Sequence, residues 1–160
     1  MLQTEGFHFN NIGTFLERGD NTARLLEVRY HELLVDGASD DKAADYYHWG
    51  ALLRALSAFK SYRMVYHDTL EREKVAELLM LNPHLPRSLN YCSRLVAGTL
   101  STLAPKTRCA VLAERLHKRF AEEDILKVTR NNFLHSVLEI FSRDSAALSD
   151  QIAKDFLFSA

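Results

Sequence analysis

The chain has 160 residues, of which 47% are hydrophobic, and its 20 basic and 21 acidic side chains give a formal net charge of -1. This length suits one domain with a sizeable core. The sequence lacks the clustered basic excess typical of nucleic-acid-binding proteins, so we expect no nucleic-acid partner. No apolar run reaches the roughly 18 residues that a membrane-spanning helix needs, and residues 1–11 do not resemble a signal peptide.

Cysteine, glycine and proline are all scarce in the sequence. The two cysteines, Cys92 and Cys109, match no metal-binding spacing, and a reduced, cytoplasmic setting is the simplest interpretation. Six glycines and three prolines favour long helices over a sheet with many turns. We therefore expect a soluble, all-α bundle of five to seven helices, folded as a single domain over residues 1–160, without a cofactor or a metal ion.

Hydrophobic periodicity near 100° per residue predicts six helical segments and no strand. These segments cover residues 9–35, 41–67, 71–81, 86–103, 106–122 and a last stretch that starts near residue 124. Gly37 suits the left-handed position that commonly follows a helix, so it is expected to end the first segment. We expect the core to consist of the apolar arcs of the first, second, fourth and sixth segments, and the fifth segment to be a surface helix with ion pairs.

Local signals refine three of these segments. Ser57, Lys60 and Ser61 interrupt the pattern of the second segment, although no proline requires a break there. Pro86 is expected in the first turn of the fourth helix, where its missing N–H costs little. Asp124 is a candidate N-cap for the sixth helix.

The first predicted helix carries a polar strip directly beside its apolar arc. On a helical wheel the strip consists of Glu17, Asp20, Asn21, Arg24, Glu27 and His31. Asp20 and Arg24 are i,i+4 neighbours and can form an ion pair. The strip is either a solvated face with weak ion pairs or a partly buried polar network that joins helices or binds a partner.

Gly19 lies inside the apolar arc of the same helix. A glycine in mid-helix costs about 1 kcal/mol relative to alanine. We therefore expect Gly19 to permit the close approach of another helix.

Short runs up to Cys92 form an ordered set. They are GFHF at 6–9, FLERGDNTARLL at 15–26, YH at 30–31, W at 49 with LLR at 52–54, AF at 58–59, LL at 78–79, and PRS at 86–88 with YC at 91–92. Together they resemble the bacterial alpha-E domain family, a domain family of unknown function, and specifically the C-terminal half of its longer members. In that family an alanine more often stands at the position of Gly19.

The resemblance implies an accessory or interaction domain associated with a circularly permuted ATP-grasp ligase that forms amide or peptide bonds. It further implies an ATP-grasp-type ligase or a transglutaminase-like protein as a partner. Self-association is also expected, because a half-length member should expose an apolar face. The candidate residues of a polar network or binding surface are Glu17, Arg18, Asp20, Asn21, Arg24, His31, Arg54 and Arg87.

Two alternatives remain open from the sequence. In the first, the chain is an enzyme of acyl or amide transfer, in which the carboxylates of the strip and His31 act as general acid and base. In the second, the chain is a metal-binding bundle, because Glu114 and His117 show the Glu-x-x-His spacing of di-iron proteins. A second matching motif is missing, so the metal alternative is the weaker of the two.

Overall fold

The computed structural model describes residues 4–35, 42–122 and 133–157, and every regular element in this part of the chain is an α-helix. The expected all-α fold is therefore confirmed. The helices are α1 (Glu5–Val35), α2 (Lys42–Ala55), α3 (Phe59–Tyr66), α4 (Arg72–Leu81), α5 (Leu89–Leu103), α6 (Arg108–Ala121) and α8 (Phe133–Leu157).

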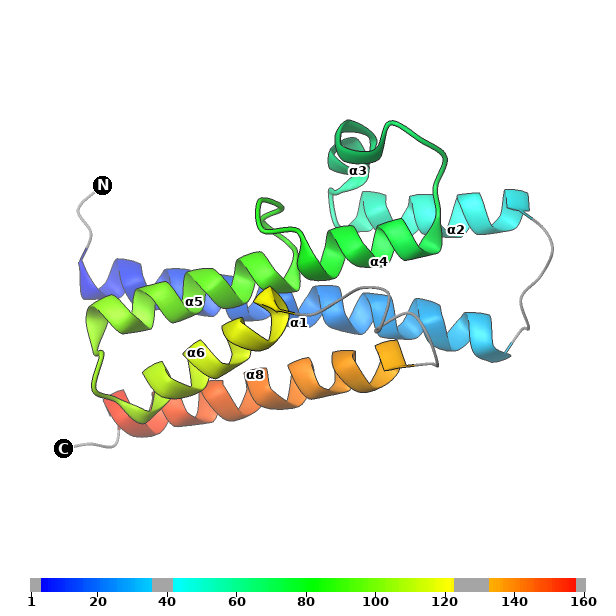
Figure 1. Cartoon of the computed structure of the whole chain (residues 1–160). Helices are drawn as coiled ribbons and strands as arrows, with labels where there is room; N and C mark the ends of the chain where they lie inside the picture. The colour runs from blue at the N-terminus through cyan, green and yellow to red at the C-terminus, as the bar shows by residue number, and fades with distance from the viewer. Residues whose placement is uncertain (1–3, 36–41, 123–132, 158–160) are drawn as a thin grey trace.

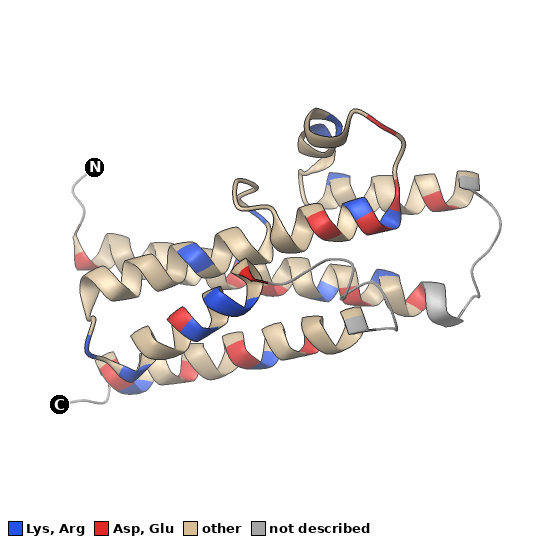
Figure 2. Ribbon diagram, in the orientation of Figure 1, with Lys and Arg blue, Asp and Glu red and all other residues tan. Residues whose placement is uncertain are grey.

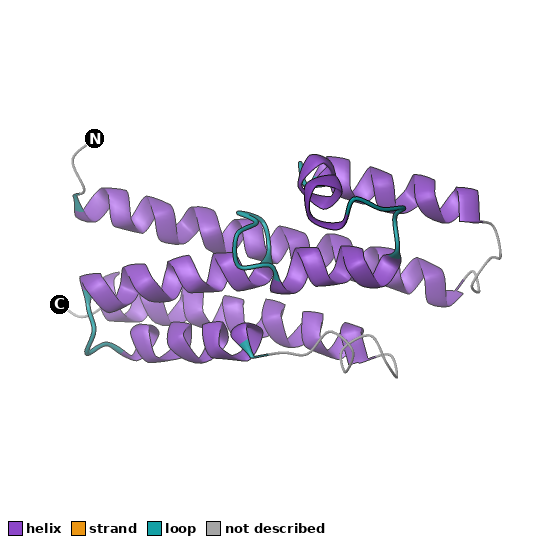
Figure 3. Ribbon diagram, turned by 45° about the horizontal axis from the view of Figure 1, so that its top comes forward, coloured by secondary structure: helices purple, strands orange, loops and turns teal. Residues whose placement is uncertain are grey.

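Four long helices, α1, α5, α6 and α8, lie side by side as an antiparallel bundle (Figures 1 and 3). The most extensive contacts join α1 to α5, α5 to α6, α6 to α8 and α8 back to α1, so the four helices enclose one core. The start of α1 and the end of α8 meet at one end, where the rings of Phe9 and Phe156 lie 4.9 Å apart. Helices α2, α3 and α4 form a smaller group at the opposite end of α1 (Figure 1).

Gly19 lies in the middle of this bundle, where α1 comes close to both α5 and α8. A methyl group placed on its Cα would lie 2.7 Å from Cζ of Phe141 on α8 and 3.3 Å from Cβ of Cys92 on α5. Both of these neighbours are buried. The prediction that Gly19 admits a neighbouring helix is confirmed, and the contact involves two helices at once.

The second predicted segment is interrupted at Ser57, which adopts a left-handed conformation with φ of 54°. The N–H of Ala58 donates to the carbonyl of Leu53 at 2.7 Å, and the N–H of Ser57 donates to the carbonyl of Arg54 at 2.9 Å. This pair of hydrogen bonds is a Schellman motif, which ends α2 without glycine or proline. Leu53 and Ala58 are both fully buried, so the accompanying apolar contact is present as well.

The starts of α5 and α6 are set by hydroxyl caps. The Oγ of Ser88 accepts the N–H of Tyr91 at 3.0 Å, and the Oγ1 of Thr107 accepts the N–H of Ala110 at 3.4 Å. The expected place of Pro86 in the first helical turn is therefore wrong, because Ser88 caps the helix two residues later. The candidate N-cap Asp124 lies outside the described residues.

The fifth predicted segment, α6, belongs to the core, contrary to expectation. It buries Cys109, Ala113, Leu116 and Phe120 against its neighbours, while its outer face keeps the expected charges, including a Glu114–Lys118 pair at 3.7 Å. Figure 2 shows acidic and basic positions interleaved along most helices, whereas central α5 carries a single charged residue. No helix in the described part of the chain is long and apolar enough to cross a membrane.

Candidate functional site

The polar strip of α1 borders a shallow groove between α1 and α8. The groove has a volume of about 330 Å³ and combines three charged side chains of α1 with small residues of both helices. It is lined by Gly13, Leu16, Glu17, Asp20, Arg24, Ser142, Ser145, Ala146 and Ser149. The residues of α8 that line the groove are all small, whereas the charged residues that line it are all on α1.

One ion pair organises the charged wall of the groove. Nε of Arg24 donates to Oδ2 of Asp20 at 2.7 Å, as their i,i+4 spacing predicts. The Arg24 side chain is 72% exposed and the Asp20 side chain 30% exposed. Glu17 and Asn21 on the same helix are also exposed. An ion pair this open to water contributes only a few tenths of a kcal/mol to stability, so it does not hold the helices together.

Arg18 points to a different face of α1 from Glu17. Its guanidinium lies 5.2 Å from the ring centroid of Phe15, and that ring lies 5.7 Å from the ring of Tyr91 on α5. Arg18 and Arg87 both lie near Cys92, where their charges act on its thiol. The structure thus brings two of the predicted arginines to the α1–α5 contact, on the other side of α1 from the groove.

Thr22 makes the hydrogen bond that ties α1 to the turn before α5. Its Oγ1 donates to the backbone carbonyl of Arg87 at 2.8 Å, and Thr22 is fully buried. Arg87 therefore does contact α1, but through its main chain rather than its charge. Sequence analysis missed Thr22, although its place in the apolar arc, three residues after Gly19, was a usable signal.

The remaining predicted residues lie apart from the groove. His31 is exposed near the far end of α1, and Arg54 lies on α2, with its guanidinium 4.8 Å from the ring centroid of Phe59. Glu27 pairs with Nδ1 of His135 on α8 at 3.1 Å, rather than with His31 four residues later. The contacts of the described residues therefore do not join the eight candidates into one network.

Arg29 is a buried cation that sequence analysis missed. It is 8% exposed, and its guanidinium lies 5.3 Å from the ring centroid of Trp49 on α2. Its Nη1 donates to Glu32 at 3.3 Å and its Nη2 to Asp45 at 3.4 Å. The signal was its spacing of three residues from the buried Leu26, which places a cation on the inner face of the helix.

Neither thiol is set up as a nucleophile. Burial raises the pKa of Cys92 to about 12, and the nearby charges of Arg18 and Arg87 offset this only in part. Burial also raises the pKa of Cys109, although the hydroxyl of Thr107 lies 3.2 Å from its sulfur. Because the thiolate is the reactive form, both cysteines are predicted to be inert in the folded protein.

Among the described residues, no three His, Cys, Asp or Glu side chains are grouped so that they could hold a metal ion. Glu114 of the Glu-x-x-His spacing is exposed, and its described ion pair is with Lys118.

The fold is an antiparallel bundle of helices, and a groove with charged residues lies along its first helix. These features define an all-helical domain. The family model of Alpha-E, described as "a predicted alpha-helical domain with a conserved ER motif", matches residues 1–157, and the chain belongs to this family. No curated protein and no solved structure matches the chain.

Three Glu-Arg dipeptides occur in the sequence, at 17–18, 71–72 and 114–115. The first lies in the run that carries the alpha-E resemblance. Its Glu17 lines the groove against α8, whereas its Arg18 packs on Phe15 toward α5. The two side chains of the dipeptide at 17–18 therefore lie at different helix contacts, Glu17 at the contact with α8 and Arg18 toward α5.

Proposed function

We propose that this chain is an accessory or interaction domain that works with a circularly permuted ATP-grasp amide or peptide ligase, and that the α1–α8 groove is its contact surface. The first part rests on what the resemblance to the Alpha-E family implies, whereas the family model itself describes only a helical domain with a conserved ER motif. The second part rests on one observation, namely that the exposed Glu17 and Arg24 and the half-buried Asp20 line a groove whose α8 side is made of small residues.

The chemistry of the groove suits a polypeptide segment of a partner. Small residues such as Gly13 and Ala146 let a partner backbone approach closely, and an alanine methyl at Gly13 would meet no atom within 4 Å. The open carboxylate of Glu17 and the guanidinium of Arg24 offer charges of both signs to such a segment. Charge complementarity of this kind sets register and specificity more than raw affinity.

An enzymatic role gains no comparable support. His31, the proposed acid or base, lies outside the groove, and both thiols are buried with raised pKa values. Residues at the groove therefore offer hydroxyls and an ion pair, but no activated nucleophile. An interaction role, in contrast, needs only the charged and small side chains that line the groove.

Affinity purification of the tagged chain from its native host, followed by mass spectrometry, tests the proposed function. We expect recovery of an ATP-grasp protein, with or without a transglutaminase-like protein. The double variant Glu17→Ala/Arg24→Ala should lose at least about tenfold in affinity for that protein, because unpaired charges would remain on the partner. Arg143→Ala is the matched control, since Arg143 is an exposed arginine of α8 outside the groove.

Two outcomes contradict the proposal. The first is recovery of no ATP-grasp protein under conditions in which the tagged chain itself is abundant. The second is a groove variant that binds the ATP-grasp protein as tightly as the wild-type chain does.

The expected self-association stays a prediction. Tyr47 on α2 and Met64 on α3 are large apolar side chains that are mostly exposed, at 68% and 74%. Light scattering over a range of protein concentrations measures self-association directly, and a mass that stays monomeric at the highest concentration would count against it.

A further inference from the structure

A second concave site lies at the other end of the molecule, where α2, α3 and the start of α4 meet. It consists of two adjoining cavities of about 490 and 550 Å³. Tyr46, Thr69 and Leu70 line both cavities, so the two adjoin, and together they are called the cleft. Cavities of this size are typical of small-molecule sites.

The wall of the cleft is held in place by its own hydrogen bonds. The hydroxyl of Tyr62 donates to the carbonyl of Thr69 at 2.9 Å and accepts the N–H of Glu71 at 3.1 Å. Lys74 bridges the carboxylates of Asp68 and Glu71 at 3.0 and 2.9 Å. The segment between α3 and α4 is thus fixed at both ends, and the cleft is preformed.

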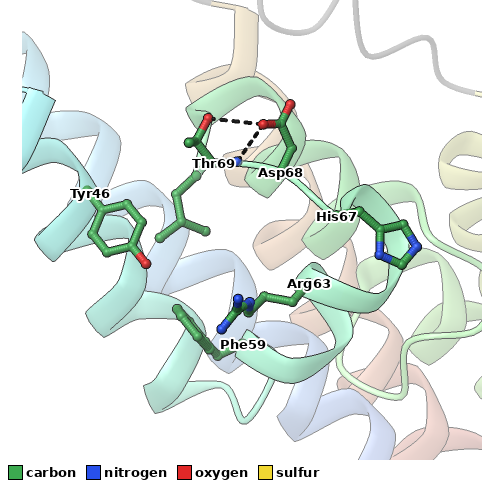
Figure 4. Close-up of a pocket in the computed structure, with 7 residues that line it drawn as sticks. Tyr46, Phe59, Arg63, His67, Asp68 and Thr69 are labelled. Atoms are coloured by element: carbon green, nitrogen blue, oxygen red, sulfur yellow. Dashed lines mark hydrogen bonds between the residues drawn. The ribbon is translucent and has the colours of Figure 1, made fainter.

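One end of the cleft combines apolar rings with arginine. Figure 4 shows the Arg63 side chain beside Phe59, with Tyr46 across the cavity from it. Arg54 lies 4.8 Å from the centroid of the same Phe59 ring but does not line the cavity, so Arg63 is the cation that a ligand meets there. Arg63 takes part in no ion pair among the described residues, whereas the carboxylate of Asp68 turns to Thr69 and to Lys74. This end therefore favours an anion next to an apolar group.

The other end of the cleft has a buried donor that lacks an acceptor. Trp49 lines this cavity, is 1% exposed, and its indole nitrogen has no hydrogen-bond partner in the structure. Nε of the buried Arg29, stacked near the Trp49 ring, likewise has none. Both nitrogens are closed to solvent and Arg29 does not line the cavity, so Trp49 serves there as a buried wall next to the ligand.

The carboxylates at this end are already neutralised by neighbouring cations. Asp45 contacts Arg29 at 3.4 Å, Glu73 contacts Arg72 at 2.7 Å, and Glu71 shares Lys74. They do not offset the positive charge at the Arg63 end.

From these contacts we propose that the cleft binds the carboxyl end of an N-acylated amino acid or peptide whose last side chain is apolar. The carboxylate pairs with Arg63, and the apolar side chain lies between Tyr46, Phe59 and Leu70. An acylated nitrogen suits the cleft better than a free ammonium group, because the carboxylates of the cleft already pair with cations. This site is separate from the α1–α8 groove, and its ligand does not depend on the proposed ligase association.

The test uses the full chain and its single tryptophan, Trp49, as the fluorescent reporter. The probes are N-acetyl-L-phenylalanine, its neutral amide, and the peptide acetyl-glycyl-glycyl-phenylalanine. We expect a saturable change in Trp49 emission with the acid, with a dissociation constant of about 1 mM, as for a small ligand. The neutral amide should bind at least about fivefold more weakly, because it lacks the charge that Arg63 pairs with.

Two variants localise the site. Arg63→Gln should weaken binding of the acid by at least about fivefold, and its exposed position leaves the fold intact. Arg143→Gln, an exposed arginine on α8, is the control and should bind as the wild-type chain does. If the tripeptide binds at least tenfold more tightly than the single residue, the natural ligand is a peptide end; equal affinities assign it to an acylated amino acid.

Three results would overturn the proposal. One is the absence of saturable binding of any probe by both fluorescence and isothermal titration calorimetry. Another is equal affinity for the acid and its neutral amide. The third is unchanged affinity of the Arg63→Gln variant.

Discussion

Replacement of Gly19 by alanine tests the packing of the bundle most sharply, because two opposing effects can be separated. Alanine raises helix propensity by about 1 kcal/mol relative to glycine. The added methyl would lie 2.7 Å from Cζ of Phe141, whose ring is buried and held on another side by Phe120 at 5.0 Å. Overpacking of this kind costs about 1–3 kcal/mol, so we expect a net loss of about 0–2 kcal/mol in the free energy of unfolding.

The cost should fall when the opposing ring is shortened. Leucine at position 141 lacks the ring atoms Cε1 and Cζ that approach Gly19, although Cβ of Cys92 would still lie 3.3 Å from the added methyl. In the Phe141→Leu background, Gly19→Ala should therefore be less destabilising than in the wild-type chain by about 1 kcal/mol or more. Urea unfolding of the four proteins, followed by circular dichroism and by Trp49 fluorescence, gives the coupling free energy.

Two results would refute this reasoning. One is a rise in the stability of the wild-type chain by the full helix-propensity gain on Gly19→Ala, which would mean that the methyl is accommodated without strain. The other is an effect of Gly19→Ala that is the same in both backgrounds to within about 0.5 kcal/mol, which would mean that Phe141 does not oppose it.

Three further predictions concern buried or capping groups. Thr22→Val should lower the free energy of unfolding by about 1–2 kcal/mol, measured by urea unfolding, because the partly buried carbonyl of Arg87 loses its donor at 2.8 Å. The N–H of Cys109 donates to the carboxylate of Asp155 at 2.8 Å and lowers the pKa of that carboxyl below 3.8. The ionised Asp155 therefore stabilises the folded protein above the pKa that it has in the unfolded chain. This contribution to stability is lost as the pH falls through the lower pKa of Asp155 in the folded protein. The difference in urea midpoint between wild type and Asp155→Asn should therefore shrink from about pH 7 to about pH 2, and a constant difference would contradict the assignment. Cys92 and Cys109 should react with Ellman's reagent only after denaturation, and rapid labelling of the native protein would show that the burial argument fails.

Much of the fold follows from periodicity, because the helices are long and their apolar arcs are regular. The first helix, for example, was predicted over residues 9–35 and is observed over Glu5–Val35. The place of α6 was not predicted, because its five buried residues alternate with an outer face that is rich in charged residues. Which helices become neighbours depends on the packing of all of them together, and a single helix pattern does not contain that information.

The candidate site was predictable only where local spacing decides it. Asp20 and Arg24 pair because they are one helical turn apart, which the sequence states directly. His135 is 108 positions from its partner Glu27, and Arg29 meets Asp45 only across two helices. Pairs between residues so far apart in the sequence can be assigned only once the arrangement of the helices is known. The sequence of α1 alone therefore does not predict them.

We propose that the α1–α8 groove is the surface through which this Alpha-E domain meets an ATP-grasp ligase. Hydrogen–deuterium exchange of the domain, with and without the purified ligase, measures the contact surface directly. We expect slower exchange in peptides that cover residues 13–24 of α1 and 142–149 of α8, and no such change in the Glu17→Ala/Arg24→Ala variant. Protection confined to α2, α3 and α4, or no protection at saturating ligase, would contradict it.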